Sequence, residues 1–321
     1  MLLLNNKKRK TAAKRGLIRN PFISDILKNP MLYLMLIPFV TYYIVFCYGP
    51  MYGVLIAFKD FSPGKGILMS PWTSKIGFGH FIDFMTGPFF KRVFGNTVVL
   101  SLGLIIFSFP APIIFAVLLN EIKNTIFKRT IQTVTYIPHF ISMMVVCGLL
   151  HTFLGRNGFI NDIIEMFGGE RTNLLAQASL FKTIFVTSDI WQQLGWGSII
   201  YLSAITAIDQ ELYEAANIDG AGRFRQMLYI TLPGLMPTII VLFILRMGSI
   251  FSVSYEKVIL LYNDMTKEKA EVISSFVYQR GLVENDYSYS TAVGLFNSVL
   301  NFSVLILTNN VSKRFTENSL W

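Results

Sequence analysis

The segment IDQELYEAANIDGAGRFRQMLYITLPGLMP, residues 208–237, is a polar stretch between two apolar runs of a 321-residue chain. Near its start, Asp209 is a suitable helix N-cap, and acidic residues in the following turns favour the positive end of a helix dipole. Gly220 can adopt the positive φ that ends a helix, after which residues 221–229 are expected to form a second short amphipathic helix. Pro233 is expected to stop that helix. The segment therefore predicts a helix-turn-helix with small residues at its bend.

The runs on both sides of this segment are typical of a helical membrane protein. The sequence is 53% hydrophobic and only 15% charged, whereas ordinary globular proteins are about 25% charged. All but one of its uncharged stretches exceed the roughly 20 residues that cross a bilayer. They cover residues 29–58, 93–120, 130–155, 190–208 and 287–312. This composition argues against a soluble domain and excludes disordered and collagen-like chains.

Six membrane-spanning helices fit the hydropathy. They are expected at about residues 31–56, 95–120, 131–154, 183–207, 234–256 and 289–310. Residues 1–30 carry eight Lys or Arg and one acid, so the positive-inside rule places this basic tail in the cytoplasm. An even number of spans then places both termini in the cytoplasm of a multi-pass protein of a bacterial-type cytoplasmic (plasma) membrane. The surplus of nine positive charges is explained by topology, and no nucleic acid is expected as a partner.

One face of the expected fourth span carries polar side chains. Asp189, Gln192, Gln193 and Trp196 are spaced i, i+3, i+4 and i+7 and therefore share a helical face. A carboxylate costs about 2.5 to 3.5 kcal/mol at the centre of a span on insertion scales, so it normally faces protein or water. Amides can pair with sugar hydroxyls, and an indole can stack on a sugar ring. We expect these residues to border a translocation cavity, together with Tyr136, Trp191, Arg246 and Tyr255.

Two interpretations of these residues remain open. Arg246 can face the cavity, where charge-assisted hydrogen bonds would suit an acidic sugar such as a uronate. Alternatively, Asp189 and Arg246 form a structural ion pair, and the aromatic residues are anchors at the membrane surface. Prolines within the expected spans are tolerated where neighbouring helices or water satisfy the freed carbonyls. They include Pro38, Pro110, Pro112 and Pro138.

Neither catalytic residues nor a metal site is predicted. The histidines at positions 80, 139 and 151 lack a paired ligand spacing such as HExxH, and Cys47 and Cys147 lie far apart in apolar runs. The sequence contains no Walker phosphate loop. We therefore expect a transport subunit and not an enzyme, and we expect it to bind no cofactor itself.

The polar segment also resembles a known family. Glu214-Ala215-Ala216, then Gly220 after three residues and Ile230-Thr231-Leu232-Pro233 after nine more, is similar to the EAA signature of permease subunits of binding-protein-dependent ABC importers. Asp219 and Ala221 flank this glycine, and in this respect the segment resembles the carbohydrate-transporting branch of the family. Two further stretches, YGPMYGVLIAFKDFSP (48–63) and ILRMGSIFSVSYEKVILLYN (244–263), are similar to permeases that import complex oligosaccharides of plant or algal polysaccharides.

This resemblance implies a fold and an assembly. The fold would be an all-α integral membrane protein with six transmembrane helices, a five-helix permease core and a cytoplasmic coupling helix-turn-helix. Its parts would be a basic tail (1–30), a first span with an outer loop (31–90), a permease domain (91–312, coupling loop 208–233) and a second cytoplasmic tail (313–321). The partners would be a second permease subunit in a heterodimer, two ATPase subunits, an extracellular solute-binding protein, an oligosaccharide substrate and membrane lipid. Because this chain lacks a Walker phosphate loop, ATP would be hydrolysed by the partner ATPase, which would also hold Mg.

The resemblance also assigns a role to the loop, which would sit in a cleft of the ATPase and transmit nucleotide-driven closure to the transmembrane helices. The docking residues would be Glu214, Ala215, Ala216, Asp219, Gly220 and Ala221. The chief alternative function is a secondary transporter or channel driven by an ion gradient, and a membrane-embedded enzyme is the third. An ion-coupled transporter needs titratable or ion-ligating groups at mid-membrane, and one Asp with one Arg is a sparse set.

Overall fold

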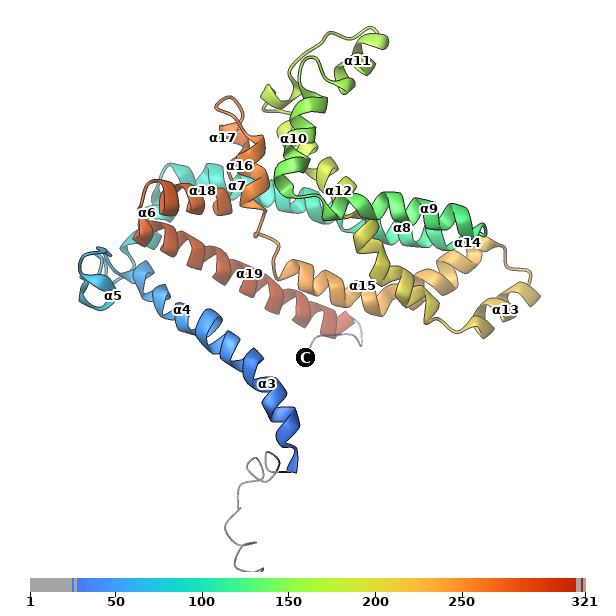
Figure 1. The fold of residues 1–321 in the computed structure, drawn as a ribbon, viewed down its shortest axis with the longest axis horizontal. Helices are drawn as coiled ribbons and strands as arrows, with labels where there is room; N and C mark the ends of the chain where they lie inside the picture. The colour runs from blue at the N-terminus through green and yellow to red at the C-terminus, as the bar shows by residue number, and fades with distance from the viewer. Residues whose placement is uncertain (1–24, 26–27, 316–318, 320–321) are drawn as a thin grey trace, which may run out of the picture. The chain divides into compact units, whose positions relative to one another are not determined.

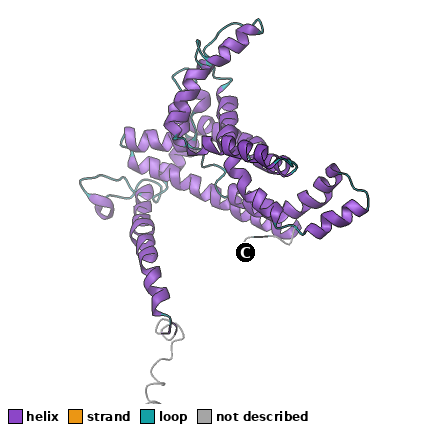
Figure 2. Cartoon of the chain, turned by 45° about the vertical axis from the view of Figure 1, so that its right-hand side comes forward, coloured by secondary structure: helices purple, strands orange, loops and turns teal. Residues whose placement is uncertain are grey.

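The computed structural model describes residue 25, residues 28–315 and residue 319, and confirms an all-α membrane fold (Figures 1 and 2). Apart from one isolated bridge between Lys59 and Trp72, the described residues form helices joined by loops. The chain divides into two compact units, residues 1–55 and 56–321. The expected basic tail lies almost wholly outside the described residues, so its position stays a prediction.

Five helices of the described chain are long and apolar enough to cross a membrane. They are Pro30–Phe58, Phe89–Asn120, Met143–Met166, Arg223–Met247 and Tyr287–Arg314. The fourth expected span corresponds to α12 (Phe181–Thr206), whose 26 residues are also long enough. Within its length α12 carries Lys182, Asp189, Gln192 and Gln193.

The first span is apolar on all sides. It comprises α3 (Pro30–Tyr42), a π-helical segment (Tyr43–Tyr48), α4 (Gly49–Met51) and a 3-10 segment (Tyr52–Phe58). Nearly all of its side chains up to residue 54 are exposed within its unit. A helix that is hydrophobic all round requires burial in lipid or against other helices.

The third span predicted at 131–154 is wrong, because the chain breaks in its middle. Helix α9 (Thr125–Tyr136) is followed by a 3-10 turn (Ile137–Phe140) and then by α10 (Met143–Leu154), which runs in a different direction (Figure 1). Pro138 lies in the turn, and the Ser142 hydroxyl accepts a hydrogen bond from the Val145 N–H at 3.4 Å. Proline and a serine N-cap thus stop one helix and start another within a continuously apolar run.

The core of the second unit is built around α12. This helix packs against α9, against α15 (Leu232–Met247) and against α8 (Pro110–Asn120). A Cβ atom on Gly195 would lie 2.2 Å from the carbonyl oxygen of Thr135, so glycine permits the close crossing of α9 and α12. Helix α8 continues α7 (Phe89–Gly103) through a π-helical turn (Leu104–Ser108). Shorter helices on the same unit are α5 (Gly66–Met69), α6 (Gly79–Thr86) and α11 (Phe159–Met166).

The predicted extent of the fifth span, 234–256, is also wrong. Helix α15 ends at Met247, and residues 248–254 are non-helical. Four further helices follow in the described residues: α16 (Tyr255–Leu261), α17 (Lys267–Ala270), α18 (Ile273–Tyr278) and, after a π-helical turn (Gln279–Val283), α19 (Tyr287–Phe315). Glycine and serine occupy positions 248, 249, 252 and 254, and their low helix propensity explains why the helix ends early. Hydropathy does not reveal this break, because the segment is still apolar on average.

Candidate functional site

The polar segment begins with the predicted helix. Helix α13 spans Gln210–Ile218, and the Asp209 carboxylate accepts a hydrogen bond from the Glu211 N–H at 3.0 Å. Gly220 has a φ of +73° and ends the turn as expected, with the Ala221 N–H donating to the Ala216 carbonyl at 2.8 Å. A non-glycine residue would be strained at that φ.

The surface of this loop is open. Glu214, Ala215, Asp219 and Gly220 are exposed, whereas Ala216 and Ala221 are half-buried. Large apolar side chains also face outward from the loop, including Leu212, Phe224 and Ile218, which is 86% exposed. An apolar surface rimmed by polar residues is typical of a protein–protein contact.

The second half of the loop differs from the prediction. A short helix over 221–229 that stops at Pro233 is wrong, because one helix runs continuously from Arg223 to Met247. Its π-helical turn at Met227–Thr231 accommodates the proline, which lacks a backbone donor. The Tyr213 hydroxyl lies 2.9 Å from the Thr231 hydroxyl, and this contact ties α13 to the base of α15.

Three of the predicted pathway residues line one cavity of about 540 Å³. Asp189 and Gln193 reach it from α12, and Arg246 reaches it from the last turn of α15. The Ser108 hydroxyl donates to the Asp189 carboxylate at 2.5 Å. The other lining residues are Phe109, Pro112, Gly197, Ile200, Tyr201, Leu242, Leu245 and Ser249.

Asp189 and Arg246 share the cavity without forming the ion pair that the sequence left open. Within the described residues, no salt bridge involves either side chain. Arg246 is exposed, so its guanidinium is free to meet a charged group that enters the cavity. This arrangement favours the cavity interpretation of Arg246 over a structural ion pair.

An aromatic and amide cluster adjoins the cavity. The Nδ1 atom of His139 lies 3.1 Å from Oε1 of Gln193. The ring of Trp196 stacks on the His139 ring, with 4.5 Å between centroids and 3° between planes, and Phe140 meets the indole edge-on. His139 was not predicted as a site residue, because only the break between α9 and α10 brings it to this position.

The other predicted pathway residues lie elsewhere. Gln192 is only 4% exposed, and Trp191 points outward. Tyr136 is half-buried at the crossing of α9 and α12, where its ring would lie 2.8 Å from a Cβ on Gly195. Tyr255 stacks on Tyr278 with centroids 5.1 Å apart, in a separate cavity of about 610 Å³ between α16, α18 and α19.

The non-helical segment 248–254 follows directly on the cavity residue Arg246. Asn301 on α19 accepts the Phe251 N–H at 2.9 Å and donates to the Ser252 hydroxyl at 3.0 Å, and the Ser101 hydroxyl donates to the Ile250 carbonyl at 2.6 Å. Irregular backbone at membrane depth is tolerated only where protein or a water-filled cavity surrounds it. Broken helices of this kind commonly border substrate sites in transporters.

Lys257 is a buried cation that the sequence interpretation missed. It is 1% exposed, its ammonium donates to the Phe185 carbonyl at 3.1 Å, and it lies 4.6 Å from the centre of the Phe185 ring. Lys257 lies in α16, outside the spanning helices. Burial lowers the pKa of its ammonium, while attraction to Asp189 opposes that shift.

Comparison with known proteins identifies the relatives of this architecture. Residues 108–317 match the family described as "Binding-protein-dependent transport system inner membrane component". The chain is 43% identical over 301 residues to Protein LplB of Bacillus subtilis (strain 168), with 94% of each chain covered. It is also 43% identical over 305 residues to the polygalacturonan/rhamnogalacturonan transport system permease protein YteP of the same organism, again with 94% of each covered.

The fold is also similar to that of solved structures. A crystal structure of a bacterial ABC transporter involved in the import of the acidic polysaccharide alginate contains a chain that aligns with a TM-score of 0.85 and 38% identity. The alignment covers 92% of this chain and 100% of that chain. A second structure of a bacterial alginate ABC transporter, in complex with an alginate pentasaccharide-bound periplasmic protein, aligns with the same TM-score and identity.

Proposed function

The chain belongs to the family of binding-protein-dependent transport system inner membrane components and is a carbohydrate permease of the ABC importer class, and from this premise we propose that it translocates acidic oligosaccharides through the cavity at Asp189, Gln193 and Arg246. The observation that carries the proposal is the exposed Arg246, which lines the cavity without an acidic partner among the described residues. Relatives named for polygalacturonan/rhamnogalacturonan transport and for alginate import support an acidic substrate.

Each cavity group has a chemical role in this proposal. Arg246 binds a uronate carboxylate through charge-assisted hydrogen bonds, for which the planar guanidinium is well suited. Gln193 and His139 supply amide and ring-nitrogen partners for sugar hydroxyls, and the exposed indole of Trp196 offers a stacking face. The Ser108 hydroxyl donates a hydrogen bond to the Asp189 carboxylate and so holds it in the cavity. There the carboxylate can accept hydrogen bonds from sugar hydroxyls.

The assembly follows from the family. We propose that two ATPase subunits hold ATP and Mg and receive the loop residues Glu214, Ala215, Ala216, Asp219, Gly220 and Ala221. A second permease subunit would complete the membrane pathway, and an external solute-binding protein would deliver the oligosaccharide. Both termini would lie in the cytoplasm, on the same side as the loop. Uptake that persists without the ATPase subunits would contradict this assembly and favour an ion-coupled transporter.

Substrate charge is tested in proteoliposomes that contain the complete transporter and its binding protein. Arg246→Gln should reduce ATP-driven uptake of an oligogalacturonate about 10- to 100-fold, the range expected for a lost charge-assisted hydrogen bond. Uptake of a neutral oligosaccharide of equal length, if any, should change much less. Arg156→Gln is the matched control, because Arg156 is exposed in the loop after α10, away from the cavity. Equal losses for both sugars, or no loss, would refute the assignment of an acidic substrate.

A further inference from the structure

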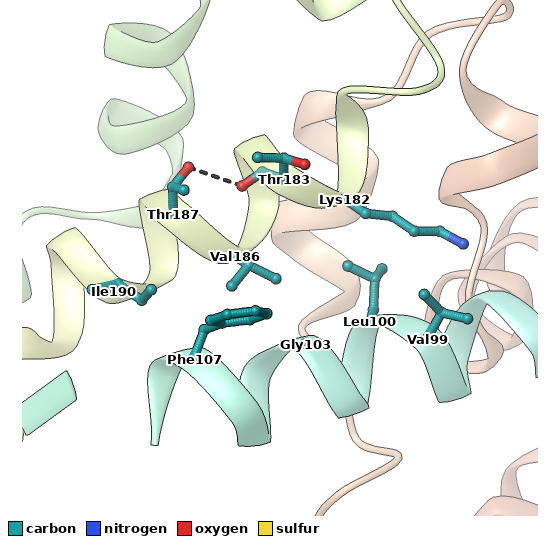
Figure 3. A pocket seen from close by; sticks show the side chains of 9 residues that line it. All are labelled: Val99, Leu100, Gly103, Phe107, Lys182, Thr183, Val186, Thr187 and Ile190. Atoms are coloured by element: carbon teal, nitrogen blue, oxygen red, sulfur yellow. Dashed lines mark hydrogen bonds between the residues drawn. The ribbon is translucent and has the colours of Figure 1, made fainter. Parts of the chain in front are cut away.

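An apolar groove lies between α12 and the segment formed by α7 and the π-helical turn that follows it (Figure 3), and it shares no lining residue with the Asp189 cavity. Its volume is about 390 Å³. Along α7 and the π-helical turn that follows it, the groove extends over nine residues, from Val99 to Phe107, or roughly 12 Å of helix. The residues that line it are Val99, Leu100, Gly103, Phe107, Lys182, Thr183, Val186, Thr187 and Ile190.

The groove is shaped by close helix packing. A Cβ atom on Gly103 would lie 3.1 Å from Cγ2 of Val186, so the glycine lets the two helices approach at the groove floor. Leu100 is fully buried in that floor, whereas Val99 and Phe107 form exposed walls. The hydroxyl of Thr187 donates to the Thr183 carbonyl of its own helix at 2.9 Å, and so it does not turn its hydrogen to the groove (Figure 3).

Positive charge gathers at one end of the groove. Lys182 extends past Leu100 and Val99 toward that end (Figure 3). Helix α17, which carries Lys269, packs against both α7 and α12 near that end, where the Asn96 amide of α7 donates to the Glu268 carbonyl at 2.9 Å. Neither lysine has a salt-bridge partner among the described residues.

The acids of α17 and its C-terminus form no ion pair with Lys182 or Lys269 in the described part of the chain. Glu271 is bonded to Arg92 at 2.5 Å, and Glu268 is exposed without an ion pair in the described part of the chain. Two unpaired cations therefore flank the end of an apolar groove that runs along two spanning helices. This end is remote from the coupling loop and, in the proposed topology, lies at the outer membrane surface.

We propose that this groove binds one acyl chain of an anionic phospholipid, with the headgroup phosphate between Lys182 and Lys269. The arrangement matches an amphiphile, because an apolar surface runs at membrane depth and the charge lies at its interfacial end. An oligosaccharide would leave its hydroxyls unpaired against walls that offer almost no polar groups. A helix of another subunit would cover the walls but would not need two unpaired lysines at one end.

The lipid is identified by photolabelling of the complete transporter in nanodiscs. The probes are phosphatidylglycerol and phosphatidylcholine that carry the same diazirine-labelled acyl chain, and labelled residues are mapped by mass spectrometry. Phosphatidylglycerol should label residues 99–107 or 182–190 several-fold more than phosphatidylcholine. Lys182→Gln should lower that preference about fivefold, the effect expected for one lysine near an anionic lipid surface. Lys182→Gln combined with Lys269→Gln should abolish it.

Two further variants separate a specific site from general attraction. Lys65→Gln removes an exposed lysine elsewhere on the outer segments and should leave the preference unchanged. Thr187→Leu fills the groove while keeping both lysines and should reduce labelling by both probes. Equal labelling by the two lipids in the unmodified protein would overturn the proposal, as would crosslinks to another subunit in place of lipid. Displacement of the phosphatidylglycerol label by soluble oligogalacturonate would assign the lysines to the sugar and would also overturn it.

Discussion

Replacement of Gly220 should disrupt the contact of the loop with the ATPase without unfolding the permease. The φ of +73° is in the left-handed region, and no atom lies within 4 Å of the position where a Cβ would stand. A substitution is therefore opposed by backbone conformation and not by packing within this chain. The conformational cost for a residue with a Cβ is roughly 1–2 kcal/mol, which corresponds to about a 5- to 30-fold shift in the population of the native turn.

Two variants separate backbone conformation from side-chain size. Gly220→Ala adds one carbon and imposes the backbone cost. Gly220→Asn adds a larger side chain, but asparagine tolerates the left-handed region better than other non-glycine residues. If the partner occupies the open space beside Gly220, both variants should lose ATPase binding, with Gly220→Asn at least as impaired as Gly220→Ala. If only the turn matters, Gly220→Asn should bind almost normally.

The assays are copurification of the ATPase with the affinity-tagged permease and ATP-driven uptake in proteoliposomes. Gly222→Ala is the matched control, because Gly222 has an ordinary φ of −68° and open space around it. It should bind and transport nearly as well as the unmodified protein. Membrane insertion should be normal in all three variants. Full transport by both Gly220 variants would refute the docking role of the loop.

Three other substitutions test the packing and polar contacts around the cavity. Gly195→Ala would place a Cβ 2.2 Å from the Thr135 oxygen and should lower the melting temperature in detergent, because overpacking costs about 1–3 kcal/mol. Asn301→Ala leaves the Phe251 N–H without its acceptor at a cost of about 1–3 kcal/mol, and uptake should fall while the ATPase still copurifies. Lys257→Met should lower the melting temperature, because it removes the buried ammonium that donates to the Phe185 carbonyl and lies over the Phe185 ring.

Features set by local sequence were predictable. The N-cap at Asp209 and the positive φ at Gly220 depend on a few neighbouring residues, and both occur as expected. The shared face of Asp189 and Gln193 follows from helical periodicity alone and leads to one cavity. The expectation that the loop docks on an ATPase came from the family signature, because helical periodicity gives no information about a binding partner.

Features set by contacts distant in sequence were not predictable. Hydropathy is continuous through residues 137–142 and 248–254, so neither helix break was predicted. The second break is stabilised by Asn301, about 50 residues away in sequence. The sequence left open an ion pair between Asp189 and Arg246, whereas the structure gives the Asp189 carboxylate a hydrogen bond from the Ser108 hydroxyl. Such pairings depend on how the helices pack, which hydropathy does not specify.

The continuous helix from Arg223 to Met247 suggests how the loop and the cavity are linked. Leu235 is fully buried among residues of α8 and α12, and a Cβ on the adjacent Gly234 would lie 2.6 Å from Ile208, so the helix is held tightly at this point. Arg223 lies 12 residues before Leu235 and Arg246 lies 11 after it, or roughly 18 and 16 Å along the axis. A helix that pivots at Leu235 therefore converts a displacement of the loop into an opposite displacement of Arg246 of similar size.

The break after Met247 would permit such a movement. If α15 continued as a straight helix into the outer segments, its far end would be fixed by the core that surrounds Val258 and Leu261. The non-helical residues 248–254 instead join the moving helix to that core through hydrogen bonds from Ser101 and Asn301. Loss of the Asn301 contact should then uncouple the cavity from the loop without weakening ATPase binding. The separation of these two effects distinguishes a pivoting helix from a general loss of stability.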